Sequence, residues 1–270
     1  MIAIDEYWMS CVIPIFYANG TVCGTGLLFT INKHLCLITA AHVAEDVKTN
    51  QENVGVHADK GSNLFSFKNC DVFMAKESKD QDKYDVAIIR LNENEDLYRH
   101  LEENYSFLST SSIANYRQGF SSFFITGFPI EEPAMGKHKI GGLGRLFKFQ
   151  TEEYKGPFSE SVKRDPDHDI FLSYSDELIY NNGVAKTAQN LHGVSGCPIW
   201  GVIQKKSETQ GIWCAENEFK IVGFEVSYTP NIWIRGIKWY AVACTFGYFD
   251  VSAKERIYEA LNNEIIRTGK

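Results

Sequence analysis

The chain has little of what marks several specialised classes of protein. Its 270 residues include only 7 prolines and 21 glycines, too few for a low-complexity or collagen-like chain. It carries 27 basic against 34 acidic residues, and no run of Lys or Arg offsets the net charge of −7. Nucleic acids and membrane surfaces are both bound through clustered basic side chains. We therefore expect neither as a partner.

Cysteine is present, but not in a pattern that binds a metal or forms a redox pair. The seven cysteines are an odd number, and no two of them have C-x-x-C spacing. We interpret them as scattered, buried thiols that stay reduced in the cytoplasm. The sequence predicts no cofactor and no metal site. Residues 165–169, Asp-Pro-Asp-His-Asp, are interpreted as a polar surface turn rather than as metal ligands.

Residues 7–32 contain no charged side chain, a length that can cross a bilayer. The stretch is interrupted by turn signals at Pro14 and at Asn19, which a glycine follows. Asp5 and Glu6 precede it, whereas a secretory leader opens with basic residues. We interpret the stretch as buried strands and not as a targeting segment.

Short runs of β-branched and aromatic residues dominate the first 250 residues, with polar turns between them. Strands are predicted over residues 12–17, 26–31, 35–39, 54–57, 64–67, 70–74, 86–91, 121–126, 146–149, 170–174, 199–203, 220–226 and 239–244.

The polar stretch over residues 92–118 divides these strands into two groups, and Ile257, Leu261 and Ile265 have helical spacing near the end of the chain. The predicted fold class is therefore all-β, with two packed six-stranded antiparallel barrels and a C-terminal helix. The barrels would occupy residues 1–91 and 119–250, with a crossover over residues 92–118 and the helix over residues 251–270.

Two short segments place chemistry-bearing side chains at strand ends. Residues 37–43, Leu-Ile-Thr-Ala-Ala-His-Val, end an apolar strand in two small residues and His42. Residues 84–91, Tyr-Asp-Val-Ala-Ile-Ile-Arg-Leu, open an apolar strand with Asp85, a carboxylate that needs a partner where it meets the core. Taken singly, a histidine of this kind is more often structural and an aspartate more often caps a turn.

A third segment, residues 191–200, reads Leu-His-Gly-Val-Ser-Gly-Cys-Pro-Ile-Trp and brackets Ser195 with glycines. Because Gly193 has no Cβ, its peptide can rotate until its N–H and that of Ser195 point at one spot. Two amides that converge beside a hydroxyl form an oxyanion hole. An ordinary Gly-Ser turn is the alternative, but the proline and the apolar strand that follow favour the oxyanion hole.

These three segments, in this order, resemble those of the trypsin/chymotrypsin-like serine peptidases. Residues 24–29, Gly-Thr-Gly-Leu-Leu-Phe, are similar to the strand before the histidine in the bacterial-type intracellular branch of that family. Residues 124–129, Phe-Ile-Thr-Gly-Phe-Pro, resemble the opening strand of its second barrel. Each motif alone is weak, whereas the ordered set covers essentially the whole chain.

The resemblance implies a serine endopeptidase that acts on a protein or peptide substrate. Ser195 would attack the carbonyl, His42 would take and return the proton, and Asp85 would hold the imidazole. The amides of Gly193 and Ser195 would bind the oxyanion. The resemblance also places the floor of the substrate pocket near Gln189 and one wall along Val226, Ser227 and Tyr228. A neutral floor predicts no preference for Arg or Lys at the cleaved bond.

Two departures from the family pattern bear on regulation and on the nucleophile. Val194 stands where secreted members that are activated by cleavage carry an aspartate, so we expect no such activation. A regulatory protein partner is then a candidate restraint, and the polar residues 151–169 are the segment that would order with it. Cys197 lies outside the glycine frame around Ser195, which disfavours it as the nucleophile.

Two other functions stay open at the level of sequence. The first is a catalytically inactive protein-binding module that keeps the trypsin fold and uses its cleft for recognition. The second is an esterase of small acyl groups that uses the same triad. The presence of His42, Asp85, Gly193 and Ser195 together favours an enzyme, because a binding module needs none of them.

Overall fold

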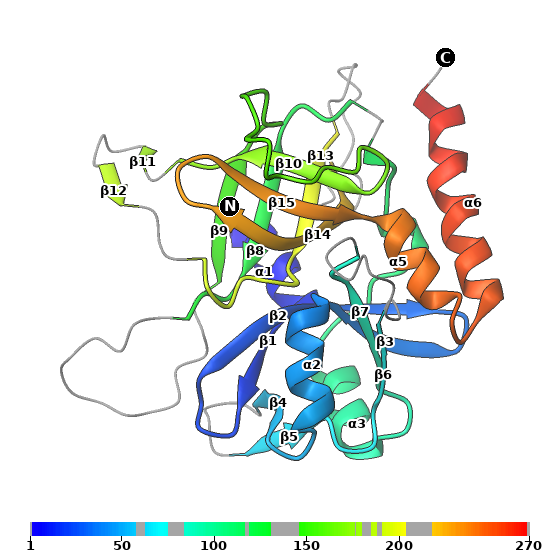
Figure 1. Ribbon diagram of the computed structural model, residues 1–270. Coiled ribbons are helices and arrows are strands. Elements are labelled where there is room, and N and C mark those ends of the chain that lie inside the picture. Colours follow the sequence, from blue (N-terminus) through cyan, green and yellow to red (C-terminus); the bar gives the residue numbers. More distant parts are fainter. Residues whose placement is uncertain are drawn as a thin grey trace.

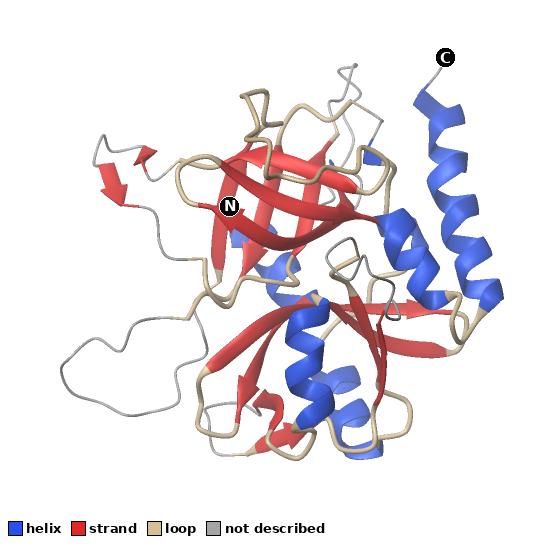
Figure 2. Ribbon diagram, in the orientation of Figure 1, coloured by secondary structure: helices blue, strands red, loops and turns tan. Residues whose placement is uncertain are grey.

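The computed structural model describes residues 2–57, 63–74, 84–116, 119–130, 146–175, 177–179, 185–187, 191–203 and 218–268. Two curled antiparallel sheets lie one above the other, with the last two helices along one side of both (Figure 1). Helices are few beside the two stacked sheets (Figure 2). The predicted class of a double β-barrel with a C-terminal helix is confirmed, although the first sheet has seven strands where six were predicted.

The first sheet has the strand order β5-β4-β1-β2-β3-β7-β6. The predicted hairpin at Asn19 is confirmed, since β1 pairs with β2 and Gly20 takes a φ of 82° in the turn between them. A side chain other than glycine rarely adopts that conformation. The strands are β1 (Val12–Tyr17), β2 (Val22–Ile31), β3 (His34–Thr39), β4 (Val54–His57), β5 (Leu64–Ser66), β6 (Asp71–Met74) and β7 (Ala87–Arg90).

The second sheet has the strand order β10-β15-β14-β13-β8-β9, and a separate hairpin joins β11 to β12. Its core alternates along β9, where Phe147 and Phe149 are buried and the two residues Lys148 and Gln150 are exposed. The strands are β8 (Phe123–Gly127), β9 (Phe147–Thr151), β10 (Asp169–Ser173), β11 (Glu177–Ile179), β12 (Ala185–Thr187), β13 (Pro198–Val202), β14 (Phe219–Thr229) and β15 (Trp233–Lys238).

Two predicted strand regions are helices. Residues 7–11 belong to α1 (Ile2–Cys11), and residues 239–244 belong to α5 (Trp239–Phe246). Helix α5 is apolar over most of its circumference and largely buried, so its sequence lacks the alternation of polar and apolar residues that reveals a surface helix. The other helices are α2 (Ala41–Thr49), α3 (Glu95–Asn104), the 3-10 turn η3 (Thr110–Ser112) and α6 (Val251–Thr268). Among the described helices, none combines the length and the hydropathy needed to cross a membrane.

One hydrophobic core connects the two sheets. Phe29 of the first sheet packs against Trp239 of α5 with ring centroids 5.2 Å apart, and Phe224 of the second sheet packs 5.3 Å from the same indole. The ring centroids of Trp8 on α1 and Trp200 on β13 are 6.1 Å apart. All five side chains are buried, so the core holds the loops at the junction of the two sheets in fixed positions.

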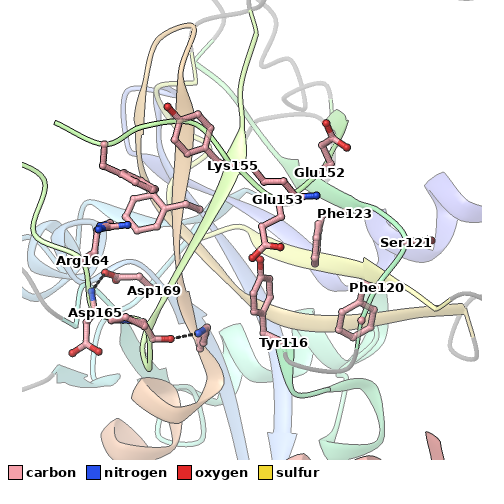
Figure 3. Close-up of a pocket in the computed structure, with 16 residues that line it drawn as sticks. Tyr116, Phe120, Ser121, Phe123, Glu152, Glu153, Lys155, Arg164, Asp165 and Asp169 are labelled. Carbon is pink, nitrogen blue, oxygen red and sulfur yellow. Dashed lines mark hydrogen bonds between the residues drawn. The ribbon is translucent and has the colours of Figure 1, made fainter.

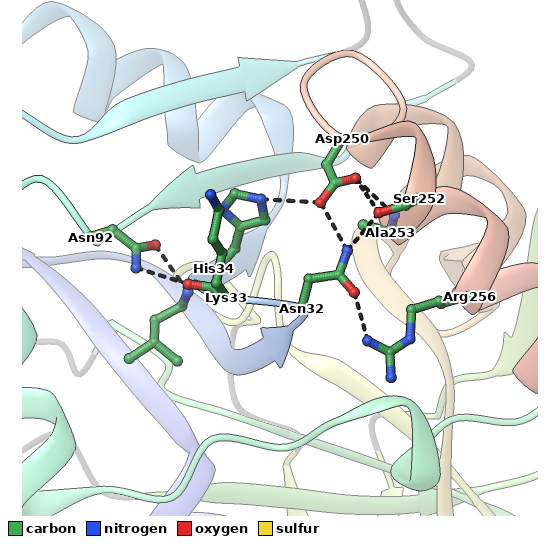
Figure 4. Close-up of polar contacts among 9 residues, drawn as sticks. Asn32, Lys33, His34, Asn92, Asp250, Ser252, Ala253 and Arg256 are labelled. Atoms are coloured by element: carbon green, nitrogen blue, oxygen red, sulfur yellow. Dashed lines mark hydrogen bonds and ion pairs between the residues drawn. The ribbon is translucent and has the colours of Figure 1, made fainter.

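The start of α6 is tied to the turn between β2 and β3 (Figure 4). Asp250 accepts hydrogen bonds from Asn32 Nδ2 at 2.8 Å, from Ser252 Oγ at 2.7 Å and from the Ala253 amide at 3.1 Å, and it lies 3.1 Å from His34 Nε2. The bond from Ser252, and then those from the other donors, lower the pKa of Asp250. This aspartate caps the helix and fixes it against the first sheet.

Candidate active site

His42 and Asp85 are brought together by the pairing of β3 with β7. Thr39, which ends β3, lies opposite Ala87 at the start of β7, so the residues just beyond each strand end meet. His42 lies in the first turn of α2, where its backbone N–H donates to Asp85 Oδ1 at 3.0 Å. Its ring Nδ1 lies 2.8 Å from Asp85 Oδ2. One carboxylate therefore fixes both the main chain and the ring of the histidine.

The electrostatic surroundings of His42 favour its protonated form. The hydrogen bond to Asp85 raises the pKa of the imidazole most; burial opposes this, and the charges of Asp85, Glu225 and Asp46 add to it. The histidine side chain is 51% exposed and the Asp85 side chain 23% exposed, so one edge of the ring remains open to a reacting group. An imidazole held in this way can accept a proton and return it.

The turn that carries Ser195 requires glycine at two positions. Gly193 and Gly196 both take a φ of 89°. A Cβ on Gly193 would lie 2.8 Å from the Phe128 carbonyl oxygen, and one on Gly196 would lie 2.2 Å from Thr39 Oγ1. The glycine frame predicted to matter around Ser195 is therefore demanded both by backbone conformation and by close packing.

The backbone amides of this turn fall into two groups. Those of Val194, Gly196 and Cys197 donate to the carbonyl oxygens of residues 191, 225 and 194 at 3.0, 2.8 and 3.0 Å. Those of Gly193 and Ser195 donate to no backbone acceptor within the described ranges. Two unused donors that flank one residue are what an oxyanion hole needs.

Thr25 of β2 ties the serine turn to the first sheet, a role that the sequence alone did not reveal. Its buried hydroxyl donates to the Gly193 carbonyl oxygen at 2.8 Å and accepts from the Phe128 amide at 2.9 Å. Its amide donates to the Ser195 carbonyl oxygen at 2.9 Å, and Thr39 Oγ1 donates to its carbonyl oxygen at 2.7 Å. The sheet that carries His42 thus also holds the turn that carries Ser195.

In the described structure no hydrogen bond joins the Ser195 hydroxyl to the His42 imidazole. The Ser195 hydroxyl lowers the pKa of the Glu225 carboxyl on β14, although no hydrogen bond of regular geometry joins the two side chains. Sequence reasoning missed Glu225. The available signal was a single acidic residue within the otherwise apolar run 221–226, Ile-Val-Gly-Phe-Glu-Val.

Glu225 is an unusual carboxyl because it is only 1% exposed and neither oxygen has a partner in regular hydrogen-bonding geometry. Its pKa is raised to about 8, chiefly by burial; the charge of His42 opposes this rise, the charge of Asp85 adds to it, and the Ser195 hydroxyl opposes it. His42, Asp85 and Ser195 therefore all act on the buried carboxyl of Glu225.

The residues predicted for the substrate pocket are only partly visible. Gln189 lies outside the described residues. Val226 is buried on β14, whereas Ser227 and Tyr228, the next two residues of that strand, are half-buried. The Tyr228 ring lies edge-on to His192, with centroids 6.2 Å apart, so this end of β14 adjoins the serine turn.

Cys197 does not compete with Ser195 as the nucleophile, and the described residues form no cluster of metal ligands. Cys197 is buried, and burial raises its pKa well above the ordinary value, so its thiol is not activated. Within the described ranges no group of three or more His, Cys, Asp or Glu side chains is arranged to hold a metal ion. In the acidic turn, Asp169 pairs with Arg235 at 2.9 Å and Asp165 with His168 at 3.1 Å.

A separate cavity of about 690 Å³ lies on the second sheet, and none of the predicted site residues lines it. Tyr116 and Phe120 lie on one side of it, and Arg164 and Asp165 lie on the other (Figure 3). Its lining draws on the polar segment 151–169. The cavity combines aromatic rings with charges of both signs, and nothing in it resembles a reactive centre.

Comparison with known proteins gives structural neighbours only. No family model matches the chain, and no curated protein matches it. Solved structures do match. An inactive form of the M. tuberculosis protease Rv3671c has 15% identity, covers 91% of each chain and gives a TM-score of 0.47. The active form has 16% identity, covers 90% of this chain and 82% of that one, and gives 0.45.

The serine protease domain of the Sesbania mosaic virus polyprotein has 16% identity, covers 86% of this chain and 91% of that one, and gives a TM-score of 0.43. These neighbours are serine proteases of trypsin-like fold. At such identities and scores the likeness carries no argument about chemistry. The functional argument therefore rests on the side chains and amides of this chain.

Proposed function

We propose that the chain is a serine endopeptidase that hydrolyses peptide bonds in a protein or peptide substrate. The observation that carries the proposal is that the Asp85 carboxylate contacts His42 twice. Its Oδ1 lies 3.0 Å from the His42 backbone nitrogen, and its Oδ2 lies 2.8 Å from the ring Nδ1. Ser195 lies in a turn bracketed by glycines, and the amides of Gly193 and Ser195 in that turn have no backbone acceptor in the described chain.

The chemistry would follow from these groups. With Nδ1–H donating to Asp85, the other ring nitrogen of His42 is free to take the proton of the Ser195 hydroxyl as its oxygen attacks the substrate carbonyl carbon. The amides of Gly193 and Ser195 would donate to the oxyanion. The C–N bond then breaks, the amine leaves with the proton from His42, and water releases the acyl group in the same way.

Asp85 stabilises the imidazolium that forms in this step. Its hydrogen bond and its charge both raise the pKa of His42, so the protonated ring is favoured at the moment when it holds the proton. The six described cysteines are all free, in agreement with a reducing compartment, and we place the enzyme in the cytoplasm as part of the same proposal.

A protein-binding module without activity is the second candidate. The observation that favours it is that no hydrogen bond joins the Ser195 hydroxyl to His42 in the described structure, while this hydroxyl lowers the pKa of Glu225. The half-buried Ser195 side chain can change acceptor by rotation about one bond between staggered positions, which is a small barrier. The two candidates differ in whether peptide bonds are broken.

The test is cleavage of an unfolded protein, with the new termini identified by mass spectrometry. The proposal predicts new termini with the wild type and none with the Ser195→Ala variant. The matched control is Ser106→Ala, which removes a hydroxyl from an exposed serine elsewhere in the chain. Stable binding of the unfolded protein by both wild type and Ser195→Ala, with no new termini, would establish the binding module instead.

A further inference from the structure

Glu225 lies at the point where the second sheet meets the serine turn. Its amide donates to the Cys197 carbonyl oxygen at 2.9 Å, and its carbonyl oxygen accepts from the Gly196 amide at 2.8 Å. The pairing of β14 with β15 shifts register between Glu225 and Ser227, which marks a β-bulge. Bulges next to reactive sites re-aim side chains, and this one directly follows the carboxyl in question.

The carboxyl of Glu225 is buried away from water and has no hydrogen-bond partner of regular geometry. Both of its oxygens lack a hydrogen bond of ordinary geometry, and the residue is 1% exposed. A buried polar group of this kind costs stability, so its presence calls for a role.

The groups that shift the pKa of Glu225, apart from burial, come from three segments of the chain. His42 acts on it from α2, Asp85 from the segment before β7, and Ser195 from the turn before β13. Asp46, further along α2, acts on the same site through His42, and the buried Cys197 thiol feels the charge of Glu225.

The Ser195 hydroxyl carries one hydrogen, which the carboxyl of Glu225 can accept and which, in the proposed function, the free ring nitrogen of His42 has to accept. An ionised carboxylate can only accept hydrogen bonds, so it would accept the hydrogen bond of the Ser195 hydroxyl and direct that hydrogen away from His42. A protonated carboxyl can donate its own hydrogen to the serine oxygen, which leaves the hydroxyl hydrogen for His42.

We propose that Glu225 is a positioning residue whose protonation state decides whether the Ser195 hydroxyl is directed to His42 or held away from it. The inference rests on the proposed function, because it assigns the serine to the imidazole in the active state. No bond beyond these hydrogen bonds is made or broken, and the proton on Glu225 exchanges with solvent.

The direction of the effect follows from the burial of the carboxyl. With its pKa raised to about 8, Glu225 is mostly protonated at neutral pH, and the directed state prevails. Above that pH the carboxylate forms and retains the serine. Reactivity of Ser195 should therefore fall on the alkaline side, where the neutral imidazole alone would leave it constant.

The test is the rate of covalent labelling of Ser195 by a fluorophosphonate, in which the serine oxygen displaces fluoride from phosphorus. The rate is measured between pH 6 and 10 in the wild type, in Glu225→Gln and in Glu45→Gln. Glu45 lies exposed on α2, three residues after His42, and its replacement makes the same Glu-to-Gln change at an exposed position near the site. Circular dichroism at each pH reports that the proteins stay folded.

The wild type and Glu45→Gln should lose labelling rate above pH 8, by roughly tenfold per pH unit once the carboxylate dominates. Glu225→Gln should keep its plateau, because an amide donates to the serine oxygen at every pH. If Glu225→Gln does not fold, Glu225→Leu replaces it and should likewise lack the alkaline fall, on a lower plateau.

An alkaline fall that persists in Glu225→Gln, or a wild type with no such fall, would overturn the role of Glu225 and leave the proposed function standing. Wild-type protein that is not labelled at any pH would overturn the proposed function and this inference together. The two failures are thus distinguished by whether Ser195 reacts at all.

Discussion

Replacement of Glu225 by Gln should stabilise the protein at neutral and alkaline pH. The carboxyl is buried without a regular hydrogen-bond partner, and its pKa rises from an ordinary 4.5 to about 8 on folding. Between these two pH values the unfolded chain has released a proton that the folded chain still binds. The wild type therefore loses stability across this window, while the amide of the variant does not titrate.

The magnitude follows from the separation of the two pKa values. The two pKa values lie about 3.5 pH units apart, and each unit corresponds to roughly 1.4 kcal/mol. The change in the free energy of unfolding therefore approaches about 5 kcal/mol. The stability contributed by protonated Glu225 is fully present below pH 4.5, declines up to pH 8 and is gone above it. Other carboxyls titrate in the same range, so the informative quantity is the difference between wild type and variant.

The assay is urea unfolding of the wild type, Glu225→Gln and Glu45→Gln at a series of pH values from 4 to 9. The free energy of unfolding of Glu225→Gln minus that of the wild type should rise by several kcal/mol across the series. The same difference for Glu45→Gln should stay nearly flat, since that side chain is exposed. A flat difference for Glu225→Gln would refute the reasoning that this carboxyl is desolvated.

Four further predictions follow from single contacts. Thr25→Val removes a buried hydroxyl that makes two hydrogen bonds, so it should lower the free energy of unfolding by about 1–3 kcal/mol and slow labelling of Ser195 by a fluorophosphonate. Gly196→Ala forces a Cβ to within 2.2 Å of Thr39 Oγ1 at a φ of 89°, and thermal unfolding should show a loss of about 2 kcal/mol or more. Asp85→Asn should leave the fold intact by circular dichroism but slow labelling of Ser195 by roughly ten-thousand-fold, because the imidazole loses its orienting carboxylate. Asp250→Ala should cost about 1 kcal/mol near neutral pH as a lost helix cap, and urea unfolding should show this cost begin to shrink as the pH falls below about 4, since the folded aspartate has a lowered pKa and loses its advantage progressively as it is protonated.

Much of the fold was predictable because turn residues and apolar alternation act locally. The hairpin at Asn19 and the strand over residues 54–57 were predicted from neighbouring residues alone, and both are confirmed. Helix α5 was not predictable in this way. Its run Trp-Tyr-Ala-Val-Ala-Cys packs against α6 and against strands of both sheets, and a segment that is apolar on nearly every side has no period from which helix can be told from strand.

The candidate site likewise contains some residues that the local sequence reveals and others that it does not. His42 and Asp85 were identified from local sequence, and the structure brings them to hydrogen-bonding distance. Thr25 and Glu225 were not identified, because their importance depends on contacts between segments far apart in the chain. The bond from Thr25 to Gly193 spans 168 residues, and the burial of Glu225 arises only when the turn around Ser195 packs on β14.

The central claim is that His42, Asp85 and the amides around Gly193 make Ser195 a nucleophile. Its most direct test is intact-mass measurement after exposure to a fluorophosphonate at pH 7, with wild type, Ser195→Ala and His42→Ala side by side. We predict one adduct on the wild type and none on either variant. A wild type that gains no adduct, or an adduct that persists in Ser195→Ala, would contradict the claim.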